Sequence, residues 1–334
     1  MAKPVVLVVE SDAQVRALLV QLLTEWGYRV DDTDSLEGLL DRLSSSDYSL
    51  AVAEYIEPGH PRRDSWPVLA ALQHLAPQIP VVAIYADSPP KPDANLVGAV
   101  QLPDLEEPLR AMAHRHARKS IGAPANPRLA LCLRSLWLGD PDGALITIRD
   151  ALHQGIPVAN VFDDLLATAM HQFGEWWGAG SCRIADEHHA TSVVDEVIAR
   201  MLFLVHRAPP IDRRAVLACV PAELHNLGLK MAAFVLRLEG WRVHMLGANT
   251  PESDILAFVG RTGPDLVAIS ATIPVDLSDL SQLIASLKQR AGTRVVLGGQ
   301  AFSGMEQAQA LGADGYSSRV SELMPLVHRL VGDQ

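Results

Sequence analysis

A glutamate, a histidine and a glycine stand together directly after an apolar run of the sequence. Glu223, His225 and Gly228 follow the segment 215–220, which reads Ala-Val-Leu-Ala-Cys-Val. An imidazole in such a loop can coordinate a metal through one ring nitrogen, while a carboxylate two residues earlier accepts the N–H of the other ring nitrogen. That hydrogen bond fixes the tautomer and raises the basicity of the ligand. Such a pair can act as a metal-ligating histidine with its own orienting carboxylate.

The segments on either side predict where this loop lies. The apolar run predicts a buried strand, and the apolar spacing over 227–239 predicts a helix. Further apolar strand runs follow at 266–269 and 295–297, separated by another helical pattern. Ligands of open parallel sheets bind at the carboxyl ends of the strands. We therefore expect the loop at that edge of an alternating strand–helix domain spanning residues 212–334.

The pattern Glu-x-His-x-x-Gly resembles the corrinoid-binding loop of cobalamin-binding domains. Later landmarks of that family follow in order, namely Leu246–Pro251, Ser270-Ala271-Thr272, Gly298-Gly299 and Gly312–Tyr316. By this resemblance, His225 coordinates the cobalt of cobalamin from below, in place of the cofactor's own benzimidazole. Small residues are expected to line the slot for the buried nucleotide tail, because the tail passes close to backbone. The cofactor-binding residues implied here are Glu223, His225, Gly228, Ser270, Thr272, Gly298 and Gly299. The alternative is that His225 is a polar surface or capping residue.

A second group of residues lies upstream, in the segment 128–208. Its four stretches of helical apolar spacing, at 129–138, 142–154, 158–177 and 184–205, predict a small four-helix bundle.

Trp177, nine further residues and then Glu187-His188 resemble a motif of adenosylcobalamin-dependent light-sensing transcription regulators. In that family the bundle caps the upper face of the corrin. By the resemblance, Trp177 covers the adenosyl group, and Glu187 and His188 contact it. Some members carry a histidine directly after the tryptophan that binds cobalt after light, but Gly178 stands there in this chain. The other candidates for that position are His171, His188 and His189. The alternative is that Trp176 and Trp177 are both core aromatics and that Glu187-His188 is a solvated helix start.

The segment 1–118 alternates predicted strands and helices and resembles the receiver domain of two-component response regulators. Strands are expected at 5–9, 48–53, 80–85 and 98–102, in a flavodoxin-like parallel sheet, and Asp12 is placed to cap a helix over 13–27. A segment rich in small residues and proline, 119–127, is the expected linker to the bundle.

Receiver chemistry needs two acidic residues after the first strand, an aspartate after the third, a hydroxyl after the fourth and a lysine before a proline after the fifth. The corresponding positions read Glu10-Ser11, Glu54, Tyr85 and Leu102-Pro103. Because the acceptor is a glutamate and the lysine is replaced by leucine, we expect a pseudo-receiver that takes no phosphate. Glu54 either mimics a phosphorylated state or is a tolerated polar residue, and both interpretations stay open.

Composition narrows the classes of partner. The 334 residues carry a net charge of −11 and no run rich in Lys or Arg. Phosphate neutralisation supplies most of the affinity for nucleic acid, so no direct nucleic acid binding is expected. The three scattered cysteines predict neither a disulfide framework nor a CxxC metal site. With no signal peptide and no apolar run of membrane-spanning length, we expect a cytoplasmic protein without membrane contact.

The expected fold class is a multidomain α/β protein. It combines a flavodoxin-like receiver domain, a four-helix bundle and a flavodoxin- or Rossmann-like cobalamin-binding domain. The resemblances imply a cobalamin-binding signalling protein without enzymatic activity, acting in transcription regulation. It would be an adenosylcobalamin-dependent photoreceptor in which light cleaves the Co–C bond and rearranges the bundle. The rearrangement would change oligomerisation, as in a homo-oligomer, or the binding of a regulatory partner protein.

Other functions remain open at this stage. Methylcobalamin or hydroxocobalamin are the other cofactor forms. The main alternative is a corrinoid methyl-carrier protein of a methyltransferase system, which shares the histidine loop and a helical cap. A scaffold without cofactor is a further alternative. A cobalamin mutase fits poorly, because it needs a substrate barrel of about 250 residues that no segment supplies.

Overall fold

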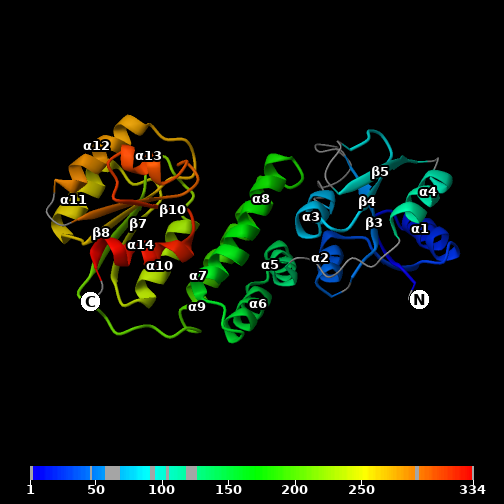
Figure 1. Ribbon diagram of the computed structural model, residues 1–334, viewed down its shortest axis with the longest axis horizontal. Coiled ribbons are helices and arrows are strands. Elements are labelled where there is room, and N and C mark those ends of the chain that lie inside the picture. The colour runs from blue at the N-terminus through cyan, green and yellow to red at the C-terminus, as the bar shows by residue number, and fades with distance from the viewer. Residues whose placement is uncertain are drawn as a thin grey trace. The chain divides into compact units, whose positions relative to one another are not determined.

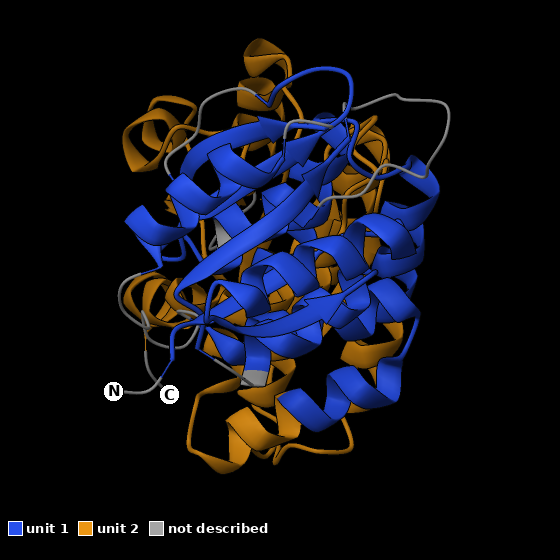
Figure 2. Ribbon diagram, turned by 90° about the vertical axis from the view of Figure 1, so that its right-hand side faces the viewer, with its two compact units in different colours: residues 1–147, 168–194 blue, residues 148–167, 195–334 orange. Residues whose placement is uncertain are grey.

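The chain is described by a computed structural model over residues 3–45, 47–56, 68–90, 95–102, 105–117, 126–289 and 293–332. It divides into two compact units, shown in Figure 2. The first comprises residues 1–147 and 168–194, and the second comprises 148–167 and 195–334. Nearly all of the expected linker 119–127, and Pro103, lie outside the described residues. The domain boundaries expected from the sequence stay predictions. None of the helices in the described ranges is both long and apolar enough to cross a bilayer.

The sheet of the first unit has five parallel strands in the order β2-β1-β3-β4-β5. They are β1 (Val5–Val9), β2 (Arg29–Thr33), β3 (Leu50–Tyr55), β4 (Val81–Tyr85) and β5 (Leu96–Gln101). Their helices are α1 (Ala13–Glu25), α2 (Leu36–Ser45), α3 (Val68–Leu75) and α4 (Glu106–His116) (Figure 1). This is the flavodoxin-like order, as predicted. The sequence did not reveal β2, because this edge strand reads Arg-Val-Asp-Asp-Thr and buries only Thr33.

Packing and capping explain why this sheet and its first helix form. Helices α1 and α4 cover one face of the sheet, where Leu19, Leu23 and Leu109 join one apolar cluster with the strands. The Asp12 carboxylate accepts the amides of Gln14 and Val15 at 2.9 and 3.1 Å, which satisfies two of the unpaired donors at the start of α1. The predicted cap is confirmed, although α1 ends at Glu25, two residues earlier than expected.

The helical segment comprises α5 (Pro127–Leu138), α6 (Pro141–His153), α7 (Val158–Val161), the π-helix η1 (Phe162–Ala167), α8 (Thr168–Gly178) and α9 (Ile184–Met201). Two expectations are corrected. The stretch 158–177 is not one α-helix, because η1 interrupts it. The last helix ends at Met201 rather than at residue 205.

The buried carboxylate of Asp163, in the π-helix η1, caps a later helix of the second unit. Asp163 accepts the amides of Val320 and Ser321 at 2.8 and 2.9 Å, at the start of a later helix. That helix has no cap from its own N-cap residue, Arg319. Asp163 therefore supplies an N-cap from a distant part of the chain, and π turns often mark such special positions.

The second unit has a parallel sheet in the order β10-β9-β8-β6-β7. Its strands are β6 (Arg214–Cys219), β7 (Arg242–Gly247), β8 (Leu266–Ser270), β9 (Arg294–Gly298) and β10 (Gly315–Ser317). Its helices are α10 (Leu227–Leu238), α11 (Glu252–Thr262), α12 (Leu277–Lys288), α13 (Met305–Ala310) and α14 (Val320–Val331) (Figure 1). Helices α11, α12 and α13 pack on one face, while α10 and α14 contact each other and strands of the sheet. The strand order reverses between β6 and β8, which is where a doubly wound sheet binds ligands.

Candidate functional site

The loop between β6 and α10 holds a fully buried carboxylate beside an exposed imidazole. The Glu223 side chain is 0% exposed, and the His225 side chain is 62% exposed. One carboxylate oxygen of Glu223, Oε1, lies 2.7 Å from both the backbone nitrogen and the ring Nδ1 of His225. The other oxygen, Oε2, accepts the amides of Thr272 and Ile273 in the loop after β8. Glu223 thus joins the two loops that flank the reversal of strand order.

These four donors decide the charge of Glu223. Burial, the largest single influence, raises the pKa of this carboxyl. The hydrogen bonds from the Thr272, His225 and Ile273 amides and from the His225 ring outweigh burial and hold the pKa below its usual value. The carboxylate is therefore ionised and accepts a proton-bearing Nδ1. This assigns the proton of His225 to Nδ1 and leaves Nε2 with its lone pair available as a metal ligand.

The residues around this loop fit a large flat cofactor ligated at His225. A side chain on Gly228, in the first turn of α10, would meet no atom within 4 Å. Gly299 has a φ of +100°, and a Cβ there would lie 2.1 Å from the carbonyl oxygen of Ala271. The backbone at Gly299 therefore needs glycine, and it lies beside the end of β8. Ser270 and Gly298 end the paired strands β8 and β9, opposite each other in register. The donor chemistry at His225 and the open space at Gly228 both suit cobalamin.

The structure brings together most of the predicted residues of this loop group. Glu223, His225 and Thr272 are in direct hydrogen-bonded contact, while Ser270, Gly298 and Gly299 lie at the neighbouring strand ends. Their assignment to cofactor binding stays a prediction.

The second predicted group belongs to the other unit, at the end of α8 and the start of α9. Trp177 is 51% exposed, whereas its neighbour Trp176 is 1% exposed and packs edge-on against Trp137 and Phe173. The interpretation that both tryptophans are core aromatics therefore holds for Trp176 alone. An exposed indole held on a buried aromatic cluster is available to contact a ligand.

Glu187 and His188 occupy the first turn of α9. The Glu187 carboxylate accepts the Thr191 hydroxyl at 2.9 Å and lies 3.8 Å from Nε2 of His188, which is itself exposed. Of the other histidine candidates, His189 is exposed, and a Cβ on Gly139 would lie 2.4 Å from its Nε2. His171 is also exposed and belongs to α8. Nothing in the described fold of this unit favours one of the three histidines as the ligand predicted to bind cobalt after light.

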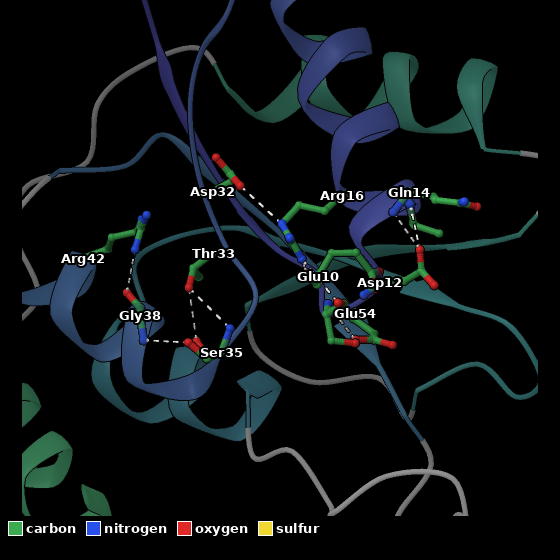
Figure 3. Close-up of polar contacts among 12 residues, drawn as sticks. Glu10, Asp12, Gln14, Arg16, Asp32, Thr33, Ser35, Gly38, Arg42 and Glu54 are labelled. Atoms are coloured by element: carbon green, nitrogen blue, oxygen red, sulfur yellow. Dashed lines mark hydrogen bonds and ion pairs between the residues drawn. The ribbon is translucent and has the colours of Figure 1, made fainter.

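The receiver-like sheet has its own acidic loops at the corresponding reversal of strand order (Figure 3). Glu54, near the carboxyl end of β3, accepts both the hydroxyl and the amide of Ser11 at 2.7 and 3.2 Å. Glu10 is buried and accepts the Asp12 amide at 2.9 Å. Arg16 donates to the carbonyl oxygen of Glu10 at 2.6 Å. The acidic side chains of these loops are therefore hydrogen-bonded within the loops, and the absence of phosphate chemistry stays a prediction.

Two further features concern possible metal and small-molecule sites. No group of three or more metal-ligating side chains occurs within the described ranges. A pocket of about 360 Å³ in the first unit is lined by residues of both charges, namely Arg16, Asp32, Thr33, Asp34, Ser35, Glu37, Gly38, Asp41, Arg42 and Arg134. Figure 3 shows part of this lining, with Arg16 directed to Asp32. The balance of its charges favours no ligand class.

Sequence reasoning did not single out Ala222 and Asn249. Both have positive φ, +65° and +46°, and they hydrogen-bond across the loops after β6 and β7. Asn249 lies in the landmark segment Leu246–Pro251, and asparagine tolerates the left-handed region better than most residues, but nothing in the sequence pairs it with Ala222.

Comparisons with known proteins identify the family of both functional regions. Two family models, each described as a B12 binding domain, match residues 131–201 and 213–323. These regions contain the two predicted groups of residues. A cobalamin or related corrinoid is therefore the cofactor of this chain.

The relatives are of two kinds, transcriptional repressors and corrinoid proteins. HTH-type transcriptional repressor CarH of Myxococcus xanthus is 34% identical over 157 residues, which is 46% of this chain and 52% of CarH. Dimethylamine corrinoid protein 3 of Methanosarcina acetivorans is 24% identical over 183 residues, 53% of this chain and 84% of that protein. The solved monomethylamine corrinoid protein of Methanosarcina barkeri is 15% identical with a TM-score of 0.52, covering 59% of this chain and 95% of that one. This similarity to the solved structure shows a shared fold.

The similarity to CarH corrects one expectation. Direct nucleic acid binding was not expected from the net charge of −11, but CarH is a repressor of the helix-turn-helix type, a class that reads DNA with a helix. The inference was wrong because neither the net charge of a whole chain nor the lack of a run rich in Lys or Arg excludes basic residues spaced along one face of a helix. This chain spans about half the length of CarH. Within the limits of these matches, the chain is a protein with B12 binding domains, related to the transcriptional repressor CarH and carrying a receiver-like parallel sheet.

Proposed function

We propose that this chain is an adenosylcobalamin-dependent light-sensing regulator. One observation carries the proposal. The buried Glu223 carboxylate orients the exposed His225 ring at the reversal of strand order, inside the region matched to a B12 binding domain. The alternative reading of His225 as a surface or capping residue does not explain a fully buried carboxylate with four donors.

Each residue of the lower group has a separate task in this proposal. His225 offers Nε2 to the cobalt, and Glu223 fixes the ring and its tautomer. Ser270, Thr272, Gly298 and Gly299 line the slot for the nucleotide tail, and Gly228 leaves open space at the start of α10.

The upper group supports the choice of the adenosyl form. When bound, adenosylcobalamin supplies a cobalt–carbon bond that light cleaves. Trp177 covers the adenosyl group with its exposed indole, and Glu187 and His188 offer hydrogen-bonding groups beside it. The buried neighbours of Trp177 hold α8 in place, so a change at Trp177 is transmitted to the helix and not absorbed by a loose side chain.

The proposed output is a change in oligomeric state or in the binding of a partner, used in transcription regulation. The similarity to CarH, a transcriptional repressor, supports this output. The receiver-like sheet serves self-association or docking in the proposal, because its acidic loops are bonded internally.

The test is an absorption spectrum of protein reconstituted with adenosylcobalamin in darkness and recorded again after green light. We expect a bound spectrum that changes irreversibly, together with a change in oligomer size measured by light scattering. His225→Ala should weaken binding and shift the bound spectrum to a form without histidine ligation. His206→Ala, an exposed histidine outside the loop, is the matched control. An unchanged His225→Ala spectrum would remove this residue from the cobalt.

A corrinoid methyl carrier is the second candidate. It is supported by the similarity to a dimethylamine corrinoid protein over most of that protein's length. A carrier needs no response of its quaternary structure to light. Tight binding of cobalamin with identical oligomer size before and after illumination, and with methylcobalamin held as firmly as the adenosyl form, would favour the carrier.

A further inference from the structure

Two residues with left-handed backbone face each other across the loops that follow β6 and β7. Ala222 has a φ of +65° and Asn249 a φ of +46°. Such angles are costly for alanine in particular, and they persist only where surrounding contacts impose them. The two strands are hydrogen-bonded neighbours, so their carboxyl-terminal loops lie side by side.

The contacts that impose these angles are reciprocal. The amide of Ala222 donates to the Asn249 side-chain oxygen at 2.8 Å, and the amide of Asn249 donates to the carbonyl oxygen of Glu223 at 2.8 Å. The Asn249 side chain thus holds the residue before Glu223, while its backbone holds Glu223 itself. These bonds fix the loop from the β7 side.

The loop is fixed from its other side by Glu223, whose Oε2 accepts two amides after β8. His225 therefore sits on a loop clamped by both neighbouring loops before any cofactor is present. A loop held in its binding conformation loses less freedom when a ligand binds, which raises affinity.

We propose that Asn249 is a positioning residue that presets the His225 loop for ligation. The inference rests on the proposed binding of cobalamin at His225 and assigns a role to a residue outside the Glu-x-His-x-x-Gly pattern. Asn249 acts through Ala222 and Glu223 and does not itself touch the cobalt.

The decisive variant is Asn249→Gly, because glycine keeps the left-handed backbone and removes only the side-chain acceptor. Asn249→Asp keeps an acceptor oxygen at the same place and should behave as the wild type. Thr293→Val is a matched control, since its hydroxyl makes a comparable side-chain to backbone bond, to Pro264 at 2.9 Å, before the start of β9.

Hydrogen exchange of the cofactor-free protein tests the clamp directly. We expect faster exchange of the amides over 222–226 in Asn249→Gly, by about fivefold for the loss of one net hydrogen bond, and no change there in Thr293→Val. Hydroxocobalamin should then associate more slowly with Asn249→Gly than with the wild type, by no more than this factor because only molecules with an open loop are lost to binding, and the histidine-ligated spectrum should be retained once bound.

Unchanged exchange over 222–226 in Asn249→Gly, or an equal effect in Thr293→Val, would overturn the clamp. A slower association that Asn249→Asp does not restore would also overturn it. Failure of the wild-type protein to bind cobalamin would instead refute the proposed function, and with it the ligand-presetting role. The exchange data would still show whether Asn249 holds the loop.

Discussion

Replacing Glu223 with glutamine tests the central feature of the site. The two side chains have nearly the same shape, so no cavity is created. The carboxylate accepts four N–H donors, two at each oxygen. Glutamine offers one acceptor oxygen and an amide that is itself a donor. If its oxygen serves Thr272 and Ile273, its NH₂ faces the backbone N–H of His225.

The magnitude follows from these contacts. The His225 ring can adopt its other tautomer and accept from the new amide, but the His225 backbone N–H is left unpaired. A buried donor without a partner costs about 1–3 kcal/mol, and the bonds that remain lose the strength that a charged acceptor gives them. We expect Glu223→Gln to lower the free energy of local unfolding by about 3 kcal/mol. Glu239→Gln, at an exposed position after α10, makes the same chemical change as a control.

Hydrogen exchange of the cofactor-free protein is the suitable assay, because a chain with two compact units does not unfold in one two-state transition. A loss of about 3 kcal/mol corresponds to exchange faster by roughly a hundredfold in the ends of β6 and β8. Less than a threefold change, or an equal change in Glu239→Gln, would refute the idea that Glu223 ties the two loops together.

The pH dependence has a definite sign. The pKa of Glu223 is lower in the folded chain than in the unfolded chain. Its stabilising contribution is therefore complete above the unfolded pKa and is lost as the pH falls through the lower, folded pKa. Protection of these strand ends in the wild type should decrease over that acidic interval. Glu223→Gln has no such carboxyl and should lack this part of the decrease.

Three other predictions use the rest of the chain. Trp177→Ala should change local stability little but weaken the binding of adenosylcobalamin more than that of hydroxocobalamin in titrations, and equal losses for the two cobalamins would refute the covering role of Trp177. Trp176→Ala should lower the free energy of local unfolding around α8 by about 3–5 kcal/mol, measured by hydrogen exchange. Incubation with acetyl phosphate and Mg²⁺ should leave the intact mass unchanged, and an added phosphoryl group on Glu54 or elsewhere would contradict the pseudo-receiver. Burial raises the pKa of every thiol to about 12, so iodoacetamide at pH 8 should label the native protein far more slowly than the denatured one at Cys132, Cys182 and Cys219.

The sequence predicted both parallel sheets because their central strands are uninterrupted apolar runs. Val5–Val9 and Leu266–Ser270 are buried along their whole length, and such runs are typical of strands covered on both faces. Edge strand β2 lacks this signal. The π-helix η1 also lacks one, because its apolar spacing differs little from that of the α-helices on either side.

The receiver-like loops show what residue types alone can and cannot predict. The replacement of a lysine by Leu102 and of an aspartate by Glu54 was readable from the sequence. The hydrogen bond from the Ser11 hydroxyl to Glu54 was not, because it joins residues 43 positions apart that the pairing of β1 with β3 brings together. That bond favours the view that Glu54 has a structural partner of its own.

The contacts of the candidate site are also of two kinds, those that the sequence predicts and those that depend on the strand order. The spacing of Glu223 and His225 was enough to predict their hydrogen bond, since two residues in one short loop must lie close together. The second set of bonds made by Glu223, and the pairing of Ala222 with Asn249, join residues 49 and 27 positions apart. They exist because the strand order places β6 between β7 and β8, so its loop meets both neighbouring loops. A motif read along the chain predicts the ligand, but the strand order decides which residues hold its loop in place. For that reason the association of cobalamin proposed at His225 should depend on Asn249, which no local pattern around His225 contains.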